Sequence, residues 1–324
     1  MNRNPIIQIK GVKKVYNQGK ANEVRAVDDI TFDIYEGETF GLVGESGSGK
    51  STTGKLLMKL EEITDGQIIF LGDNIQNKKN RKDLLAFRKN IQMIFQDPYA
   101  SLNPRLTVKE IIGGPLEVHQ LVKNKKERDD RVYELLDLVG LNRSFANRYP
   151  REFSGGQCQR IGIARAIALE PKCIIADEAI SALDVSIQAQ IVNLLRNLKK
   201  KEKLTYLFIA HDLSMVKYIS DRIGVMNRGK LLELATADDI YHYPLHQYTE
   251  SLLSAIPEPD PISEKTRTRI GYDETKISYN ENDPDVGLYE IVPGHFVYCH
   301  QQEIAMYQKK YEALKEKKET MVLS

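Results

Sequence analysis

Residues 44–51 read Gly44-Glu45-Ser46-Gly47-Ser48-Gly49-Lys50-Ser51, a complete Gly-x-x-x-x-Gly-Lys-Ser/Thr pattern. Glycines at this spacing let backbone N–H groups converge on phosphate oxygens, and a helix that begins near Lys50 adds the positive end of its dipole. We expect Lys50 to reach the β- and γ-phosphates of a nucleotide, and the Ser51 hydroxyl to ligate Mg²⁺. The alternative interpretation is a flexible Gly/Ser turn without a ligand.

The segments on both sides of this loop have the patterns that a phosphate-binding loop needs. Residues 39–43 form a short apolar run that is typical of a buried strand, and Leu56, Leu57 and Leu60 mark one face of a helix over 51–60. The predicted order is therefore strand, glycine-rich loop and helix. This context favours nucleotide binding over a structural turn.

Apolar strand patterns alternate with helical patterns along much of the remaining chain. Ile30-Thr31-Phe32-Asp33-Ile34 alternates as a half-buried strand does. Further strands are predicted over 67–71, 91–95, 173–176, 206–210 and 222–226, a helix-rich block over 98–168, and a helix over 184–203. This alternation predicts an α/β fold with a mainly parallel sheet, into which the block 98–168 is inserted.

The apolar strand at 173–176 ends in an acidic pair, Asp177-Glu178. In nucleoside triphosphatases with a phosphate-binding loop, one acid holds Mg²⁺, and a second group can orient the attacking water. Acidic residues at a strand end are also common helix N-caps, so the pair alone would be weak evidence. Together with the loop at 44–51, it predicts catalysis.

The segment Phe153-Ser154-Gly155-Gly156-Gln157 resembles the signature motif of ATP-binding-cassette (ABC) ATPases. The motif alone is weak, because the same residues can cap a helix. The order of elements is far more specific: the loop 44–51, then Gln96, the signature, the acidic pair, Ser181-Ala182-Leu183-Asp184 and His211. The resemblance covers essentially the whole chain.

This resemblance implies the fold and the organisation of an ABC cassette. The expected fold is α/β: a P-loop NTPase with a RecA-like parallel-sheet core, an antiparallel β subdomain, an inserted α-helical subdomain and a C-terminal extension. We predict the β subdomain and the P-loop part of the core over 1–97, and the helical signature subdomain over 98–168. The remainder of the core is predicted over 169–254 and the extension over 255–324.

The resemblance also implies roles for single residues. Glu178 would be the general base, His211 a sensor of the γ-phosphate, and Gln96 a catalytic link between the nucleotide and the helical insert. The expected Mg²⁺ ligands are Ser51, Gln96 and Asp177. The residues expected to contact ATP are Tyr16, Gly44, Glu45, Ser46, Gly47, Ser48, Gly49, Lys50, Ser51, Thr52, Ser154, Gly155, Gly156, Gln157 and Asp184.

Tyr16 and the signature residues have more specific expected roles, and two further residues depart from the family pattern. Tyr16 looks like the aromatic residue that stacks on adenine, although a tyrosine at a strand end is more often simply packed. The backbone of Ser154 to Gly156 is expected to meet the γ-phosphate held by a second cassette, because two such cassettes dimerise head to tail around two ATP molecules. Cys158 and Ala179 depart from the residues that relatives commonly carry. We expect Cys158 to alter the contact across the dimer and Ala179 to loosen the turn after Glu178.

The resemblance narrows to the ATP-binding subunits of peptide importers, of the oligopeptide-permease F type in its Gram-positive version. The segments that carry it are 95–105, 181–186, 246–257 and 290–297. It implies four partners: a D-type ATP-binding subunit, two transmembrane permeases and an extracellular peptide-binding lipoprotein. The alternatives are the ATPase of a dipeptide or nickel importer, a soluble ABC protein outside transport, and a non-hydrolysing regulatory subunit.

Composition excludes several other classes of protein. The 324 residues carry 46 Lys+Arg and 45 Asp+Glu, a formal charge of +1, which offers no global attraction for nucleic acid or anionic lipid. The three cysteines are too far apart for a disulfide framework or a Cys-x-x-Cys metal site. No stretch approaches the ~20 apolar residues of a membrane helix. Composition therefore predicts a cytosolic protein, and the resemblance implies that permease contacts hold it as a peripheral protein at the cytoplasmic face of the membrane.

The C-terminal region has a character of its own. Pro257, Pro259 and Pro261 should break any helix there, and an amphipathic helix is predicted over 301–318. Its apolar stripe consists of Ile304, Tyr307, Tyr311 and Leu314. We expect this stripe to pack on the protein surface; the alternative is a helix that binds a membrane surface or a partner.

Overall fold

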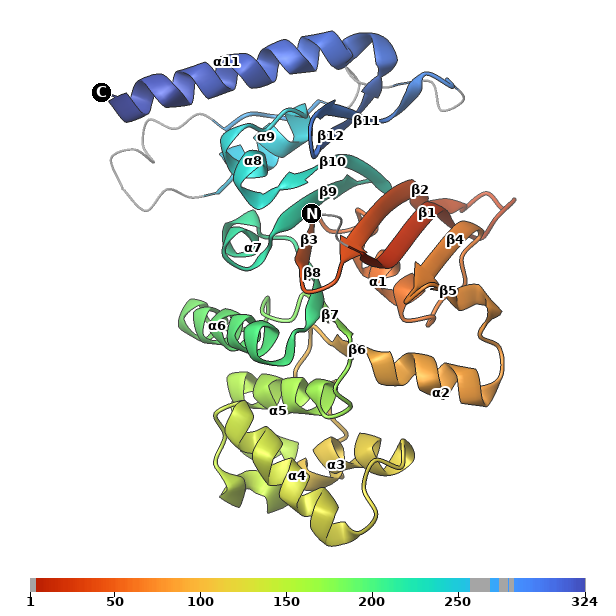
Figure 1. The fold of residues 1–324 in the computed structure, drawn as a ribbon, viewed down its shortest axis with the longest axis vertical. Coiled ribbons are helices and arrows are strands. Elements are labelled where there is room, and N and C mark those ends of the chain that lie inside the picture. Colours follow the sequence, from red (N-terminus) through yellow and green to blue (C-terminus); the bar gives the residue numbers. More distant parts are fainter. Residues whose placement is uncertain (1–3, 257–268, 274–278, 280–282, 324) are drawn as a thin grey trace.

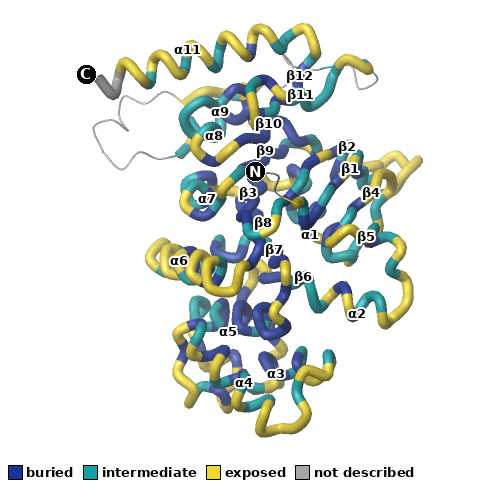
Figure 2. Tube along the Cα trace, in the orientation of Figure 1, coloured by how far each residue is buried: buried dark blue, intermediate teal, exposed yellow. Residues whose placement is uncertain are grey.

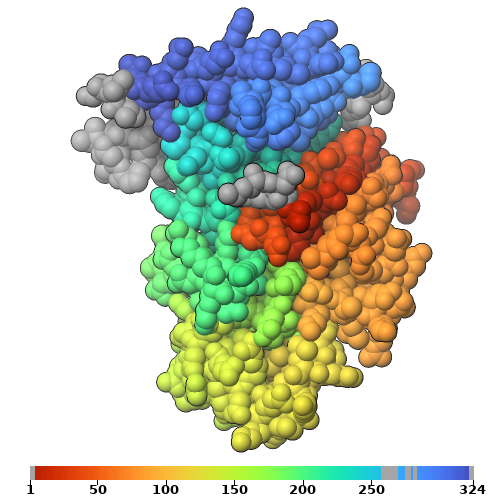
Figure 3. Space-filling view, in the orientation of Figure 1, coloured from red at the N-terminus to blue at the C-terminus, as the bar shows by residue number. Residues whose placement is uncertain are grey.

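The computed structural model describes residues 4–256, 269–273, 279 and 283–323. Two sheets form the middle of the molecule, a group of helices forms one end, and a hairpin with the last helix forms the other (Figure 1). The space-filling view shows the same division, with the C-terminal segments as a cap over the segment near residue 240 (Figure 3). The prolines at 257, 259 and 261 lie outside the described residues.

The N-terminal part is an antiparallel sheet with the strand order β2-β1-β4-β5. Its strands are β1 (Pro5–Tyr16), β2 (Val24–Tyr35), β4 (Asp65–Phe70) and β5 (Asp73–Asn74). The alternating residues Ile7, Ile9, Ile30 and Ile34 are almost completely buried. They share one core with apolar residues of the second sheet, so the two sheets pack as one unit.

The second sheet has the strand order β11-β12-β10-β9-β3-β8-β7-β6. Its strands are β3 (Thr39–Val43), β6 (Ile91–Ile94), β7 (Cys173–Asp177), β8 (Thr205–Ala210), β9 (Arg222–Asn227), β10 (Lys230–Thr236), β11 (Val286–Val292) and β12 (His295–His300). Every pair from β9 to β6 is parallel, and β10, β12 and β11 add to this core in antiparallel pairs. Each residue of β3 and β8 is buried, as expected for central parallel strands (Figure 2).

Ten α-helices lie among the described residues. They are α1 (Lys50–Leu57), α2 (Arg81–Asn90), α3 (Val108–Val118), α4 (Lys125–Leu138), α5 (Gly155–Ile167), α6 (Val185–Glu202), α7 (Leu213–Ile219), α8 (Ala237–His242), α9 (Gln247–Ser254) and α11 (Ile304–Leu323). Helices α3, α4 and α5 pack together between β6 and β7 in the chain, so they form an insertion into the parallel core. None of the helices described is both long and apolar enough to cross a membrane.

The last helix packs on the C-terminal hairpin. Tyr307 is 4% exposed, and Ile304, Tyr311 and Leu314 are partly buried with it against β11, β12 and Leu245. Lys310 adds a hydrogen bond from its Nζ to the Leu245 carbonyl at 2.7 Å. The expectation that this apolar stripe packs on the protein surface is therefore confirmed.

The structure differs from the sequence patterns at several element bounds and in some whole elements. Helix α1 ends at Leu57, earlier than the predicted residue 60. The helix-rich block contains three separate helices joined by turns. The patterns also do not predict β10, β11 and β12, and β10 and β12 each carry a polar residue in a buried position. Glu233 in β10 and His295 in β12 are fully buried, with an Oε1–Nε2 distance of 2.7 Å.

Candidate nucleotide site

The loop at 44–51 joins the end of β3 to the start of α1. Gly44 has a φ of 150° and Gly49 a φ of 103°, backbone conformations that side chains other than glycine rarely adopt. A Cβ at Gly44 would also collide with the carbonyl of Met226, and one at Gly49 with the carbonyl of Ala26. Glycine is therefore required at both positions, and the loop brings the N-terminus of α1 to the carboxyl edge of the sheet.

Lys50 is buried within this loop. Its Nζ donates hydrogen bonds to the carbonyls of Gly44 and Glu45 at 2.7 and 2.8 Å, and to Ser48 Oγ at 3.2 Å. Burial lowers the pKa of Lys50, while the nearby carboxylates, Glu178 foremost, oppose that shift. The ammonium group is thus a positive charge inside the loop, where it can reach a phosphate oxygen.

Ser51 and Asp177 come together although 126 positions separate them in the chain. The Ser51 hydroxyl donates to Asp177 Oδ1 at 2.8 Å. Burial raises the pKa of Asp177, the charge of Glu178 raises it further, and the hydrogen bond from Ser51 opposes the shift. A hydroxyl and a carboxylate at this distance are oxygen ligands of the kind that Mg²⁺ prefers, so the pair fits a magnesium ion.

Gln96 and His211 both approach the same oxygen of Glu178. Gln96 Nε2 donates to Glu178 Oε2 at 2.8 Å, and His211 Nδ1 lies 3.5 Å from that oxygen. Glu178 has a φ of 45°, in the left-handed region that a non-glycine residue seldom adopts. A cavity of about 50 Å³ lies beside Glu178 and His211. Strained backbone of this kind is frequent at functional sites, and here it holds a carboxylate beside two polar partners.

The signature residues lie at the N-terminus of α5, and within the described part of the chain no hydrogen bond or ion pair joins them to the loop 44–51. Ser154 and Gln157 cap this helix reciprocally: Ser154 N–H donates to Gln157 Oε1 at 3.0 Å, and Gln157 N–H lies 3.4 Å from Ser154 Oγ. Asp184 stands at the N-cap of α6. The chain therefore does not bring the signature and its own phosphate-binding loop together.

The remaining candidate residues are Ser46, Gly47, Thr52 and Tyr16. Ser46 and Gly47 are exposed at the tip of the loop, and Thr52 is half-buried in the first turn of α1. Tyr16 is half-buried at the end of β1, with Lys14 Nζ 4.7 Å from the centre of its ring. Tyr16 therefore has a local partner already.

Cys158 and Ala179, the two residues that depart from the family pattern, are both buried. Cys158 is fully buried, its thiol lies 3.4 Å from the Pro150 carbonyl, and burial raises the pKa of the thiol to about 11. The Cys158 side chain is thus packed in the protein core, and the expectation that it alters a contact across a dimer stays a prediction. Ala179 is also buried, and its carbonyl accepts a 2.6 Å hydrogen bond from Gln159 Nε2. That bond holds the turn after Glu178.

Sequence reasoning missed two residues that support the site. Gln159 is 1% exposed and links the turn at Ala179 to the carbonyl of Phe95, 3.4 Å from its Nε2, next to Gln96. The Glu45 N–H in the loop donates to the hydroxyl of Tyr248 at 3.0 Å. A polar residue one turn into the signature helix is a signal that could have drawn attention to Gln159. No local pattern connects Tyr248 with residue 45.

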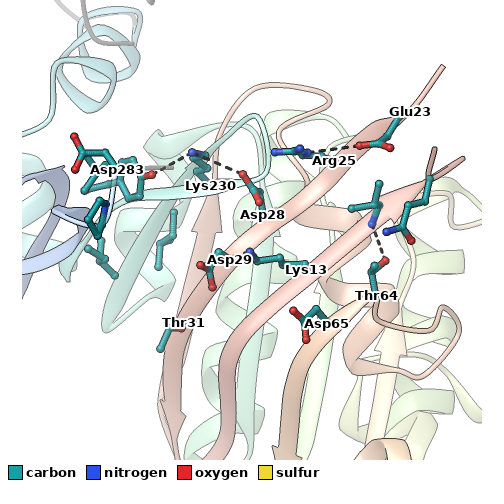
Figure 4. Close-up of a pocket in the computed structure, with 18 residues that line it drawn as sticks. Lys13, Glu23, Arg25, Asp28, Asp29, Thr31, Thr64, Asp65, Lys230 and Asp283 are labelled. Carbon is teal, nitrogen blue, oxygen red and sulfur yellow. Dashed lines mark hydrogen bonds and ion pairs between the residues drawn. The ribbon is translucent and has the colours of Figure 1, made fainter. Parts of the chain in front are cut away.

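A larger hollow lies away from all of these groups. This groove of about 1010 Å³ runs between the antiparallel sheet and the C-terminal hairpin (Figure 4). Charged side chains of both signs line it, among them Lys13, Arg25, Asp28 and Lys230, and the Lys230 ammonium lies 3.7 Å from Asp28. The groove contains none of the residues expected to bind ATP, so its size alone does not mark the functional site.

Comparison with known proteins gives consistent results over nearly the whole chain. Residues 27–181 match the ABC transporter family, and residues 232–281 match the oligopeptide/dipeptide transporter C-terminal region. The chain is 58% identical to the oligopeptide transport ATP-binding protein OppF of Streptococcus mutans, over 95% of this chain and 99% of the relative. It is 60% identical to OppF of Bacillus subtilis (92% and 97%) and 56% identical to the dipeptide transport ATP-binding protein DppF of Lactococcus lactis (94% and 97%).

Solved structures agree with these relatives. A dimeric ATP-binding cassette in a post-hydrolysis state, bound to ADP and phosphate, superposes with a TM-score of 0.65 at 30% identity. The match covers 71% of this chain and 98% of that cassette. The predicted α/β ABC cassette fold is thereby confirmed, together with ATP as the nucleotide. The chain belongs to the ABC transporter family. Within that family it is an ABC-type ATPase of the group of oligopeptide and dipeptide transport ATP-binding proteins.

Proposed function

We propose that this chain hydrolyses ATP as one of two cassettes that drive an importer of oligopeptides. The observation that carries this proposal is the convergence of Gln96 and His211 on one oxygen of Glu178, beside the paired oxygens of Ser51 and Asp177. This set contains a base, an amide that orients it, a histidine beside it, and a ligand pair for Mg²⁺. Relatives with 56–60% identity are named for oligopeptide or dipeptide transport.

Glu178 would act as the general base. Its Oε2 is held by the Gln96 amide, so the carboxylate is oriented before a water molecule arrives. His211 lies near the same oxygen and is 54% exposed, so it remains free to contact a γ-phosphate. A Mg²⁺ ion on Ser51 and Asp177 would neutralise charge that develops on the phosphate oxygens. Lys50 would add its buried positive charge to the same group.

A second cassette would complete the site. The Gly155 and Gly156 N–H groups lie in the first turn of α5, where helical N–H groups have no intrahelical acceptor. These groups can bind an anion offered by another chain, because this chain's own loop does not reach them. We propose that the other cassette is a D-type subunit. The pair would sit under two permeases at the cytoplasmic face of the membrane, with an extracellular lipoprotein delivering peptide.

Each of the four segments predicted from sequence would have its own role in this assembly. Residues 1–97 and 169–254 would hold the nucleotide, and 98–168 would carry the signature and meet a permease. Residues 255–324 would form an extension of the core. The structure supports this proposal in that α3, α4 and α5 pack together and α11 packs on the hairpin.

Reconstitution tests the proposal. The chain, its D-type partner and the two permeases would be placed in lipid vesicles, and ATP turnover and uptake of labelled peptides would be measured together. The Glu178→Gln variant should retain nucleotide binding and lose about 100-fold or more in turnover. Glu202→Gln is the matched control, since Glu202 is exposed at the end of α6. Equal turnover in the Glu178→Gln and unmodified complexes would refute the general-base role.

The substrate is tested in the same vesicles. Peptides of two and of five or more residues, and Ni²⁺, would be offered separately with the cognate binding lipoprotein. Uptake of the longer peptides that depends on ATP supports an oligopeptide importer. Uptake restricted to dipeptides or Ni²⁺ would instead assign the chain to a related importer, and ATP turnover without uptake of any of them would contradict peptide import.

A further inference from the structure

The peptide unit between Gly44 and Glu45 is held at both of its polar ends. Its carbonyl, on Gly44, accepts the 2.7 Å hydrogen bond from Lys50 Nζ. Its N–H, on Glu45, donates the 3.0 Å hydrogen bond to the hydroxyl of Tyr248. Glycine has little steric preference of its own, so a peptide unit that follows Gly44 can rotate easily unless such bonds fix it. Lys50 and Tyr248 together fix this one.

Tyr248 is well placed to hold a loop, because its own position is fixed. The residue is 2% exposed in the first turn of α9, and its ring lies against Tyr272, with 5.1 Å between ring centres. His246 caps this helix: its Nδ1 accepts the Tyr248 N–H at 3.1 Å. The hydroxyl therefore approaches the loop from a helix whose start is itself anchored.

The anchor reaches the C-terminal hairpin. The carboxylate of Glu233 in β10 accepts the N–H groups of Leu245 and His246, at 2.8 and 3.0 Å. The same carboxylate accepts a hydrogen bond from His295 Nε2 of β12, at 2.7 Å. All of these polar groups are buried, so each bond is shielded from competition by water. A continuous set of hydrogen bonds thus runs from β12 to residue 45.

We propose that Tyr248 is a positioning residue for nucleotide binding, which holds the Gly44–Glu45 peptide unit in the orientation that keeps Lys50 and the loop ready for phosphate. Without the hydroxyl, the Glu45 N–H loses its partner, and this peptide unit samples orientations in which the Gly44 carbonyl leaves Lys50. Nucleotide must then select the competent orientation from several, which weakens its apparent affinity. The inference rests on the nucleotide site and not on the identity of the transported substrate.

The Tyr248→Phe variant tests this, because it removes one oxygen and keeps the ring. Tyr206→Phe is the matched control: Tyr206 is fully buried in β8, and its hydroxyl has no hydrogen-bond partner within the described part of the chain. Binding of ADP to the purified chain would be measured by calorimetry, and the melting temperature without nucleotide would be measured in parallel. Hydrogen exchange of the segment 41–49 reports directly on the loop.

We expect Tyr248→Phe to bind ADP about fivefold more weakly than the unmodified chain, from the loss of one hydrogen bond. Exchange in 41–49 should be faster, and in the assembled ATPase KM should rise more than kcat falls. Tyr206→Phe should match the unmodified chain in all of these. ADP affinity within twofold of the unmodified chain for Tyr248→Phe, or an equal loss in Tyr206→Phe, would overturn the inference. Failure of the unmodified chain to bind ADP would instead contradict the nucleotide site itself.

Discussion

Acidification should weaken the C-terminal part of the core through His246. Burial lowers the pKa of His246 from 6.5 to about 4; Lys310 lowers it further, and Glu233 and Glu303 oppose the shift. The unfolded chain therefore takes up a proton on this residue near pH 6.5, whereas the folded chain does so only near pH 4. Stability from this difference is fully present above about pH 7 and is lost as the pH falls through this window. Proton linkage gives a loss of about 2 kcal/mol in the free energy of unfolding between about pH 7.5 and about pH 5.

The reason lies in the cap of α9. The Nδ1 of His246 must be unprotonated to accept the Tyr248 N–H, so a proton there breaks the cap as well as placing a charge in a buried position. Replacing His246 with Asn keeps an acceptor that suits an N-cap and removes the titration. Urea unfolding of the unmodified chain and of His246→Asn, at both pH values, measures the difference.

The result should be a pH-dependent gap between the two chains. The free energy of unfolding of the unmodified chain should fall by about 2 kcal/mol more than that of His246→Asn. Carboxylates also lose their contacts in acid. Their effect on the free energy of unfolding is the same in both chains and cancels in the comparison. If the two chains lose the same free energy of unfolding, the assignment of this pH dependence to His246 is refuted.

Three further substitutions follow from contacts described above. Gly49→Ala should abolish ADP binding, because the φ of Gly49 and the adjacent Ala26 carbonyl exclude a side chain. The control Gly114→Ala, in open space on α3, should bind ADP normally in the same calorimetric titration. Ser51→Ala should raise the Mg²⁺ concentration for half-maximal ATP turnover by about tenfold, and an unchanged Mg²⁺ titration would contradict the ligand role. Tyr307→Ala should cost about 3 kcal/mol in urea unfolding and expose α11 to protease, while Met306→Ala at its 53% exposed neighbour should change the free energy of unfolding by less than about 0.5 kcal/mol.

The parallel core could be predicted from sequence because its strands are buried on both faces. Residues 173–176 and 206–210 are continuous apolar runs, and both form central strands. The antiparallel addition could not be predicted in this way. Glu233 interrupts the apolar pattern of β10, and its buried carboxylate is satisfied by the N–H groups of Leu245 and His246 and by His295, which lies 62 residues further along the chain. Long-range pairing of buried polar groups leaves no periodic signal.

The nucleotide site likewise has a part that local sequence predicts and a part that only tertiary contacts reveal. The loop at 44–51 is recognisable in the sequence because its function depends on local backbone geometry, and the spacing of its glycines indicates that geometry. The roles suggested for Gln96 and His211 came from family resemblance, since neither residue has a distinctive neighbourhood in the sequence. The structure supplies their common contact with Glu178. The contact between Glu45 and Tyr248 joins residues 203 positions apart, and only the tertiary structure reveals it.

The hairpin β11–β12 has a consequence for how shortened forms of this protein should be understood. It pairs with β10 through Glu233 and Leu234, so its loss would leave β10 as an open sheet edge with a buried carboxylate that has lost His295. A premature stop codon after residue 254 would therefore yield a chain prone to self-association and proteolysis. Loss of transport in such a strain would reflect a lowered amount of folded protein, and would not by itself identify the tail as a regulatory element.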